Sequence, residues 1–396
     1  TMVMNNLTKK TTQGHETILK KILISTFAIA TLLILVFFIL IGIENSKKVH
    51  IAFYAIPESI EQPLQTHIDS WFIKNSSKRK PAYHFFSAEQ ALGEIRLKNT
   101  SLIITYNGKN LDTAQKQELS PELYKNIPSS LCKASLKDSK PYFLPLLIDH
   151  FELLSHTQTS VKMESYTNLS FYDFLDIATD VSKKTNKPSI YIAAKSDSQL
   201  LQFVGALQEV LTGTPPKDSA SHSVSEAINL LKEMQKDNII HSTWYNLTEQ
   251  DIVYYMSNED APFVFIPLSE HRKLSYNITK KYRSFFVASI KTNQSRTLTA
   301  PLISAFIPTK TSSKNKLIAE SLLSYLITPP VQARLSTTTG LAPADANANT
   351  PDIEADDLRY WVAASSQPYP GLDKAAFVTL KEQKTAANIL RNELRK

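Results

Sequence analysis

Strands and helices alternate along the chain from Val49 onward, and this alternation constrains the fold more than any other feature. The run VHIAFYAI is alternating, β-branched and aromatic, and Pro57-Glu58 then open an amphipathic helix that extends through Phe72. The sequence predicts a second strand at residues 80–86 and a buried third strand at residues 101–106. Strands that alternate with helices in this way form a parallel α/β sheet.

Polar or aromatic residues stand where two of these strands end. The first strand ends at Tyr54, and the third ends at Tyr106 and Asn107. Ligands of open α/β sheets bind beyond the carboxyl ends of the strands. We therefore predict that Tyr54, Tyr106 and Asn107 form one wall of a ligand-binding cleft.

An apolar run near the N-terminus predicts a membrane anchor. Residues 22–43 contain no charge, and these 22 residues are enough to cross a hydrocarbon core of roughly 30 Å. Four lysines precede the run and two follow it, so the positive-inside rule predicts that residues 1–21 are cytoplasmic and residues 44–396 extracytoplasmic. The expected location is the cytoplasmic (inner) membrane, crossed once, with the bulk of the chain in the periplasm.

A cleaved secretory signal is the alternative to an uncleaved anchor. The run is longer than the usual apolar region of about 7 to 15 residues, and no small-x-small cleavage site follows it, which favours the anchor. The only cysteine, Cys132, lies far from the run, so an N-terminal lipid is excluded. A single cysteine also allows no internal disulfide, which suits a large domain with its own core.

Size and charge limit the remaining possibilities. The part of the chain after the lysines at 47 and 48 has about 348 residues, more than a single-core domain usually holds, so two lobes are expected. The six lysines and two glutamates before Val49 account for +4 of the formal charge of +7, which leaves only +3. This small excess does not indicate nucleic-acid binding.

Two carboxylates interrupt a long apolar segment in the first half of the chain. Residues 139–157, SKPYFLPLLIDHFELLSHT, carry Asp149 and Glu152 within an otherwise apolar run. Buried carboxylates need partners. Asp149 and Glu152 therefore need partners, and a cap or salt bridge at a hinge would provide one for Asp149.

A helical hairpin is predicted late in the chain. Apolar residues recur at helical spacing from Leu317 to Leu326, Pro329 and Pro330 break the helix, and a second short helix ends at Gly340. Further elements are predicted between and after these segments: helices at 88–97, 168–184, 198–211, 226–238, 247–256 and 358–364 and from 372, and strands at 188–194, 261–267, 283–290 and 298–307.

This order of elements resembles the type II periplasmic solute-binding proteins, the extracellular receptors of ABC importers, and in particular their carbohydrate receptors. The resemblance rests on the hairpin that ends in T-x-T-G followed by L-x-P-A, on Pro145 within the segment 143–155, and on the elements between Ala227 and Leu268. It implies a two-lobed α/β clamshell preceded by one transmembrane helix. Lobe 1 is expected at about 49–148 and 303–328, and lobe 2 at about 149–302 and 329–396, with crossings near Asp149, Leu302 and Thr328.

The resemblance also implies a site and partners. Asp149, Asp197 and Ser269 would contact a small, sugar-like solute between the lobes, and Tyr369 would add an aromatic contact. A solvated turn is the alternative for Asp197, and core or interface packing is the alternative for Tyr369. No tryptophan stands near Ser269, which weakens the expectation of sugar stacking. The expected partners are ABC permease subunits, the solute and the membrane through residues 22–43, with no cofactor.

Catalytic motifs are missing from the sequence. HExxH, GxSxG, P-loop and GxGxxG patterns do not occur, and the histidines show no metal-ligand spacing with cysteine. We therefore expect a binding protein and not an enzyme. The alternative function is a degenerate receptor fold that binds partner proteins at the cell envelope; the eight glycines in the chain, few for a receptor whose loops approach a ligand, favour it.

Overall fold

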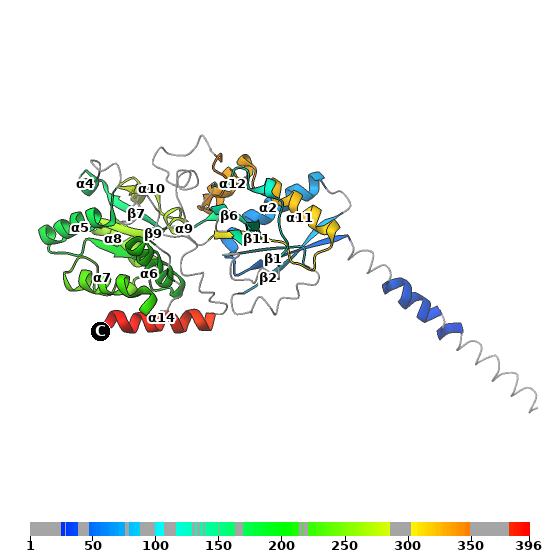
Figure 1. Ribbon diagram of the computed structural model, residues 1–396, viewed down its shortest axis with the longest axis horizontal. Helices are drawn as coiled ribbons and strands as arrows, with labels where there is room; N and C mark the ends of the chain where they lie inside the picture. Colours follow the sequence, from blue (N-terminus) through cyan, green and yellow to red (C-terminus); the bar gives the residue numbers. More distant parts are fainter. Residues whose placement is uncertain are drawn as a thin grey trace, which may run out of the picture.

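Two mixed sheets, each covered by helices, divide the chain into two lobes (Figure 1). The computed structural model describes residues 25–27, 29–38, 47–75, 79–87, 100–106, 116–128, 131–132, 135–137, 139–149, 151–161, 163, 169–213, 216, 221–285, 302–348 and 380–396. The predicted helices at 88–97 and 358–364 lie outside these residues, as do Asn107 and Tyr369.

Lobe 1 contains a six-stranded sheet in the order β12-β6-β11-β3-β1-β2. Its strands are β1 (Lys48–Tyr54), β2 (Lys80–Phe86), β3 (Leu102–Tyr106), β6 (Leu144–Ile148), β11 (Leu302–Phe306) and β12 (Ala342–Pro343). The predicted strands at the start of this lobe are confirmed, and β1 pairs in parallel with β2 and β3. The prediction of a wholly parallel sheet is wrong, because β11 returns from lobe 2 and runs antiparallel to β3 and β6.

Helices and a small hairpin complete lobe 1. They are α2 (Glu58–Asn75), η5 (Pro121–Tyr124), α11 (Ser313–Leu326) and α12 (Pro329–Thr339), with the hairpin formed by β4 (Leu136–Lys137) and β5 (Lys140–Pro141). The predicted helical hairpin is confirmed in α11 and α12. Its second helix begins with Pro329 and ends at Gly340, which has a φ of 75°. A proline in the first turn and a left-handed glycine at the end are the expected boundaries of such a helix.

Lobe 2 contains a four-stranded sheet in the order β10-β7-β9-β8. Its elements are β7 (Phe151–His156), α4 (Thr157–Ser160), α5 (Phe171–Thr185), β8 (Ile190–Ile192), α6 (Asp197–Thr212), η6 (Ser221–Val224), α7 (Ser225–Lys236), η7 (Trp244–Asn246), α8 (Glu249–Asn258), β9 (Phe263–Pro267), α9 (Leu268–His271), α10 (Tyr276–Thr279), β10 (Tyr282–Phe285) and α14 (Leu380–Arg395). Capping boxes at Ser170 with Asp173 and at Thr248 with Asp251 fix the starts of α5 and α8. Phe174, Phe263 and Phe265 form contacting pairs of rings in the core.

The lobe boundary differs from the one expected at Thr328. Both helices of the hairpin lie in lobe 1, because β12 pairs with β6 and the side chains of Val331 and Leu335 enter the lobe 1 core. The last helix, α14, packs on α6 and α7 of lobe 2 through Leu390 and its neighbours (Figure 1). The chain therefore stays in lobe 1 at least through Ala346, whose N–H donates to the carbonyl oxygen of Asn126 at 3.0 Å. Pairing between distant segments, which periodicity does not reveal, sets this boundary.

The N-terminal segment has exposed apolar side chains. Residues 25–27 and 29–38 are helical, and Phe27 and Phe38 are 76% and 65% exposed. Among the described residues, no helix has both the length and the apolar character required to span a membrane. The predicted span, residues 22–43, extends past the described helical residues at both ends.

Replacement of Gly340 by alanine is expected to destabilise the protein more than the same change at Gly213. An added Cβ at Gly340 would lie 2.7 Å from the Cβ of Arg272, and the positive φ adds backbone strain. We expect a loss of roughly 2–4 kcal/mol in the free energy of unfolding, from overpacking and strain together. Gly213 ends α6 with nearly the same φ, 76°, and controls for backbone strain. Urea unfolding that gave equal losses for both variants would contradict the steric role of Gly340.

Candidate functional site

The chain crosses from lobe 1 to lobe 2 at Asp149, between β6 and β7. In lobe 1, β6 ends at this crossing. Because β3 and β6 are both antiparallel to β11, they run in the same direction, and β1 is parallel to β3. All three strands therefore run toward the crossing. In lobe 2, β8 and β9 also run toward it, since β9 is antiparallel to β7 and parallel to β8. The carboxyl ends of strands from both sheets therefore meet at this lobe junction, where α/β proteins bind ligands.

Helix α9 joins the two lobes at this junction. It follows β9 of lobe 2 directly, yet its first residue, Leu268, belongs to the hydrophobic core of lobe 1. At its other end, Arg272 lies against Gly340 at the end of α12. The absence of a side chain at Gly340 is what allows these two segments to approach so closely.

Asp149 is held by Ser269 of α9 through both carboxylate oxygens. The backbone N–H of Ser269 donates to Oδ1 at 3.1 Å, and its hydroxyl donates to Oδ2 at 2.9 Å. Burial nevertheless raises the pKa of Asp149 from 3.8 to about 6; Glu270 adds to this rise, while the Ser269 bonds and Lys273 oppose it. Loss of hydration thus outweighs the hydrogen bonds that favour the charged form.

Asp149 is half-buried, and a fully buried carboxylate lies three residues further along the chain. The side chain of Glu152 is 2% exposed, and its Oε2 contacts the Nδ1 of His271 in α9. Glu270, between Ser269 and His271, forms a 2.6 Å ion pair with Lys273. Helix α9 therefore provides partners for both carboxylates of the crossing segment.

This arrangement can hydrogen-bond a polar molecule. An ionised carboxylate has about four acceptor positions, and Ser269 occupies two of those on Asp149. Hydroxyl or amine groups of a solute could use the others. In the part of the chain that the structure describes, no three or more histidine, cysteine, aspartate or glutamate side chains are arranged so that they could hold a metal ion.

The structure brings two of the predicted site residues into direct contact, Asp149 and Ser269. Tyr54 ends β1 at the same sheet edge, but its ring is buried in the lobe 1 core. Tyr106 is the last residue of β3 and so lies at this edge as well. The predictions for Asn107 and Tyr369 concern residues outside the described ones.

Asp197 follows β8 at the junction side of lobe 2, but its carboxylate is occupied. Arg391 of α14 contacts its Oδ1 at 2.5 Å and donates to the carbonyl oxygen of Lys195 at 2.6 Å. The side chain of Arg391 is 13% exposed and that of Asp197 is 31% exposed, so the pair is partly shielded from water. Asp197 anchors the C-terminal helix to the start of α6, an interaction between residues too distant in sequence to be predicted from it.

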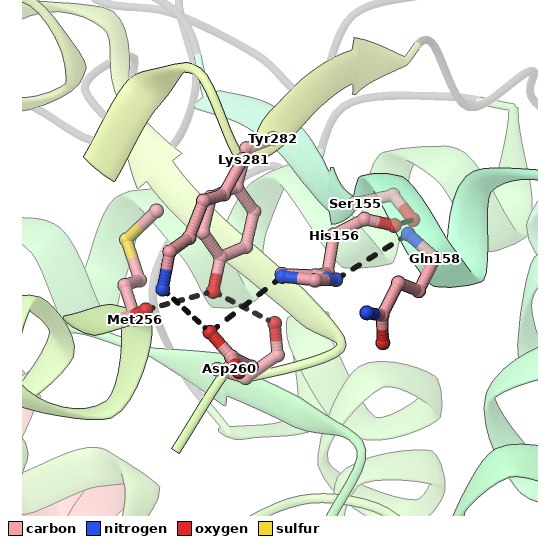
Figure 2. A network of polar contacts seen from close by, with 8 residues as sticks. Ser155, His156, Gln158, Met256, Asp260, Lys281 and Tyr282 are labelled. Atoms are coloured by element: carbon pink, nitrogen blue, oxygen red, sulfur yellow. Dashed lines mark hydrogen bonds and ion pairs between the residues drawn. The ribbon is translucent and has the colours of Figure 1, made fainter. Parts of the chain in front are cut away.

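Another polar network lies at the opposite end of β7, away from the junction (Figure 2). His156 accepts a bond from the N–H of Gln158 through Nδ1 at 3.4 Å, and its Nε2 lies 3.6 Å from Asp260. Lys281 donates to Asp260 at 2.9 Å, and the hydroxyl of Tyr282 donates to the carbonyl oxygen of Ala261. Burial lowers the pKa of His156, and the bond from Lys281 lowers that of Asp260.

These contacts join the end of β7 to the segments before β9 and β10. The N–H of His156 also donates to the carbonyl oxygen of Pro262 at 2.9 Å, and the ring packs edge-on against that of Tyr282. We assign the network a structural role, because its contacts connect segments of lobe 2 to one another.

Sequence reasoning did not identify the positions that bring α9 and α12 together. Gly340 was recognised as a helix end, but not as a contact of Arg272. Leu268 directly follows the strand predicted at 261–267, and nothing in the sequence indicates that it enters the other lobe. Both are contacts between segments far apart in sequence, and local patterns carry no signal for them.

The fold and the polar lobe junction define a two-lobed binding protein, and comparisons with known proteins identify its family. The sequence profile of the bacterial extracellular solute-binding proteins matches residues 156–359, just over half of the chain. The chain belongs to this family. A search of curated proteins finds no match.

Solved structures share the fold at low sequence identity. The maltose-bound MalE3 of T. maritima is 12% identical with a TM-score of 0.60, over 87% of this chain and 99% of that one. The bacterial solute receptor AcbH is 12% identical with a TM-score of 0.66, over 88% and 99% of the two chains. Clostridium botulinum thiaminase I in complex with thiamin is also 12% identical, with a TM-score of 0.66 over 88% and 100%. These likenesses show the two-lobed α/β fold alone.

Replacement of Asp149 by asparagine is expected to stabilise the protein at neutral pH. The folded carboxyl keeps its proton to a higher pH than the unfolded one, so its contribution favours the folded state at low pH and is lost as the pH rises from 3.8 through about 6. Asparagine can still accept a bond from Ser269 and carries no charge to desolvate. We expect the variant to match the natural protein near pH 4 and to exceed it by roughly 1–3 kcal/mol above pH 7.

Denaturant unfolding across this pH range measures the effect, and Asp251→Asn is the matched control. The bonds from Thr248 lower the pKa of Asp251, so its charged form favours folding. Replacement of Asp251 should therefore reduce the free energy of unfolding above pH 5, which is the opposite of the effect expected for Asp149→Asn. A stability difference for Asp149→Asn that does not vary with pH would show that desolvation of the carboxylate is not the cause.

Proposed function

We propose that the chain is the membrane-anchored, extracytoplasmic substrate-binding component of an ABC importer and that it binds a small, sugar-like solute between its lobes. The main support for the proposal is the junction at Asp149. There the chain, which belongs to the solute-binding protein family, passes between the lobes beside a carboxylate that has unused hydrogen-bond acceptor positions. Membership of the family supports the capture of a solute. That the solute is delivered to an ABC permease is a further part of the proposal.

Asp149 and Ser269 are the central contacts of the proposed site. Tyr106 would extend it from the end of β3, Tyr54 would support it from the lobe 1 core, and Asp197 would lie at its margin. Asn107 and Tyr369, which lie outside the described residues, are proposed as further contacts. A solute that touched groups of both lobes would favour their closed arrangement, because it binds that arrangement more strongly. Helix α9 would transmit this closure, since it contacts the crossing segment, the lobe 1 core and α12.

A sugar held here would depend on hydrogen bonds more than on stacking. Two of the three tryptophans, Trp71 and Trp244, are buried in the lobe cores and offer no open face, and Trp361 lies outside the described residues. Carboxylates and hydroxyls suit the alternating donors and acceptors of a sugar. Two of the compared structures concern sugars, maltose for MalE3 and β-D-galactopyranose for AcbH, which supports a sugar-like solute.

The exposed apolar N-terminal segment supports the anchor. Its described residues present large apolar side chains such as Leu33 and Phe37, which are 64% and 61% exposed. A helix of this kind is stabilised by a hydrocarbon surrounding and not by water. Tethering would keep the binding lobes close to a permease in the same membrane and so raise their effective concentration there.

The full chain, solubilised in mild detergent, can be tested by thermal shift and calorimetry with maltose, D-galactose, tagatose and thiamin. A ligand that binds only the folded state must raise its stability. We expect one of the sugars to bind and Asp149→Ala to weaken that binding about 10- to 100-fold, as expected for a lost hydrogen bond to a charged group. Asp180→Ala, at an exposed position of α5, is the control and should bind normally.

Two outcomes would count against the proposal. Binding that is unchanged in Asp149→Ala would place the site elsewhere. No shift with any of the four compounds, together with stable capture of an envelope protein, would favour the alternative of an interaction module built on the receptor fold.

A further inference from the structure

The edge of lobe 1 opposite the junction gathers basic side chains. Because β1, β2 and β3 are parallel, their first residues lie together at this edge, next to the end of α2 and the start of α11. We call this surface the basic edge; its residues are Lys48, Lys74, Arg79, Lys80, Lys310 and Lys314.

Hydrogen bonds connect the segments of the basic edge. The N–H of Lys80 donates to the carbonyl oxygen of Lys47 at 3.2 Å, and the guanidinium of Arg79 donates to Asn315 at 2.6 Å. The hydroxyl of Thr311 donates to the carbonyl oxygen of Thr100 at 3.1 Å. The lysines therefore stand on one continuous and ordered surface.

Among the described residues, no carboxylate forms an ion pair with the six side chains of the basic edge. Residues 47–50, 72–75, 79–82 and 307–316 contain no aspartate or glutamate. Acidic side chains in the neighbouring elements have other partners: Asp69 accepts a bond from the hydroxyl of Tyr83 at 2.7 Å, Glu118 pairs with Lys140 at 2.9 Å, and Glu320 lies 3.9 Å from Lys316. The exposed lysines of the basic edge thus present a net positive face.

Two apolar side chains project from the same region. Ile73, near the end of α2, is 80% exposed, and Leu317, in the second turn of α11, is 67% exposed. A surface that combines lysines with isolated exposed aliphatic side chains suits the interface of a bilayer, where charged headgroups lie above the acyl chains.

The position of this edge in the chain suggests what covers it. Only five peptide steps, at most about 18 Å, separate Ile43 at the end of the predicted span from Lys48 at the start of β1. Figure 1 shows the N-terminal helical segment beyond the β1, β2 and α11 end of lobe 1, with lobe 2 at the opposite end. Insertion of the span would hold the basic edge against the membrane surface.

We propose that the basic edge binds the surface of an anionic phospholipid membrane, so that lobe 1 rests on the bilayer and lobe 2 points away from it. The inference rests on the anchoring proposed above and adds a second contact with the membrane. Clustered lysines beside a membrane-spanning segment are attracted to anionic headgroups within about one Debye length. With lobe 1 fixed in this way, closure moves lobe 2 toward lobe 1 while the bilayer-facing edge stays in place.

Fluorescence transfer from the full chain to labelled lipid headgroups tests the orientation. The natural cysteine is removed by Cys132→Ser, and single labels are placed by Thr309→Cys at the basic edge or Tyr276→Cys in lobe 2, both exposed positions. The protein is reconstituted in nanodiscs of phosphatidylcholine, with or without one quarter phosphatidylglycerol. We expect transfer from position 309 to rise in the anionic discs and transfer from position 276 to stay unchanged.

Salt and charge reversal identify the cause. The rise at position 309 should disappear in 1 M NaCl, where the Debye length falls from about 8 Å to about 3 Å. It should also disappear when Lys74, Lys80 and Lys310 are replaced by glutamate. The same charge change at Lys183, Lys184 and Lys236, on lobe 2 helices, should leave it intact.

The outcomes separate the two proposals. Failure of the full chain to enter neutral nanodiscs would refute the anchor. Entry with equal transfer in neutral and anionic discs would refute the basic-edge contact while leaving the anchor in place. If, in addition, soluble polyglutamate bound the protein and the edge triple variant lost that binding, the partner of the edge would be an acidic protein.

Discussion

The carboxylate at the lobe crossing is the constraint on which the rest of the structure depends. Without Asp149, residues 144–156 would read as one continuous buried strand, which could not serve two separate sheets. The break at Asp149 ends β6 in one lobe and lets β7 begin in the other. Since a desolvated carboxylate needs partners, Ser269 must lie beside it, and this requirement places α9 at the junction. The contact of α9 with α12 then follows, and it is possible only because position 340 is a glycine.

Strand direction gives lobe 1 two functional ends. The parallel strands β1, β2 and β3 begin at the basic edge, and β1 and β3 run toward the junction with lobe 2. The same sheet therefore separates the proposed membrane contact from the proposed solute contact by the length of its strands. A solute could enter between the lobes without approaching the bilayer, and the C-terminal helix, held by Arg391 to Asp197, packs on lobe 2.

Local patterns predicted local structure well and distant pairing poorly. The first strands, α2 and the helical hairpin were predicted because alternation, helical spacing, proline and glycine signal them directly. The resemblance implied a crossing near Leu302, but the antiparallel direction of β11 and the addition of β12 to the lobe 1 sheet were not predicted, since register between distant strands leaves no local signature. In the candidate site, too, a residue could be recognised from its local sequence but a distant partner could not. Asp149 stood out as a charge in an apolar run, whereas the Arg391 partner of Asp197 is 194 residues away.

The electrostatics of the junction favour a binding role over a purely structural one. A carboxyl whose pKa is raised by burial reduces the stability of the folded protein at neutral pH. An asparagine at position 149 could also hydrogen-bond the N–H and the hydroxyl of Ser269, and it would not carry the desolvation cost of a charge. The crossing between the lobes alone therefore does not require an aspartate. Ser269 leaves part of the acceptor capacity of the carboxylate unused, and the hydroxyls of a bound solute would use it while replacing the water that burial removed. If Asp149 binds a solute as proposed, the site is least stable when empty, because the hydroxyls of the solute would compensate for the desolvation that raises the pKa of Asp149.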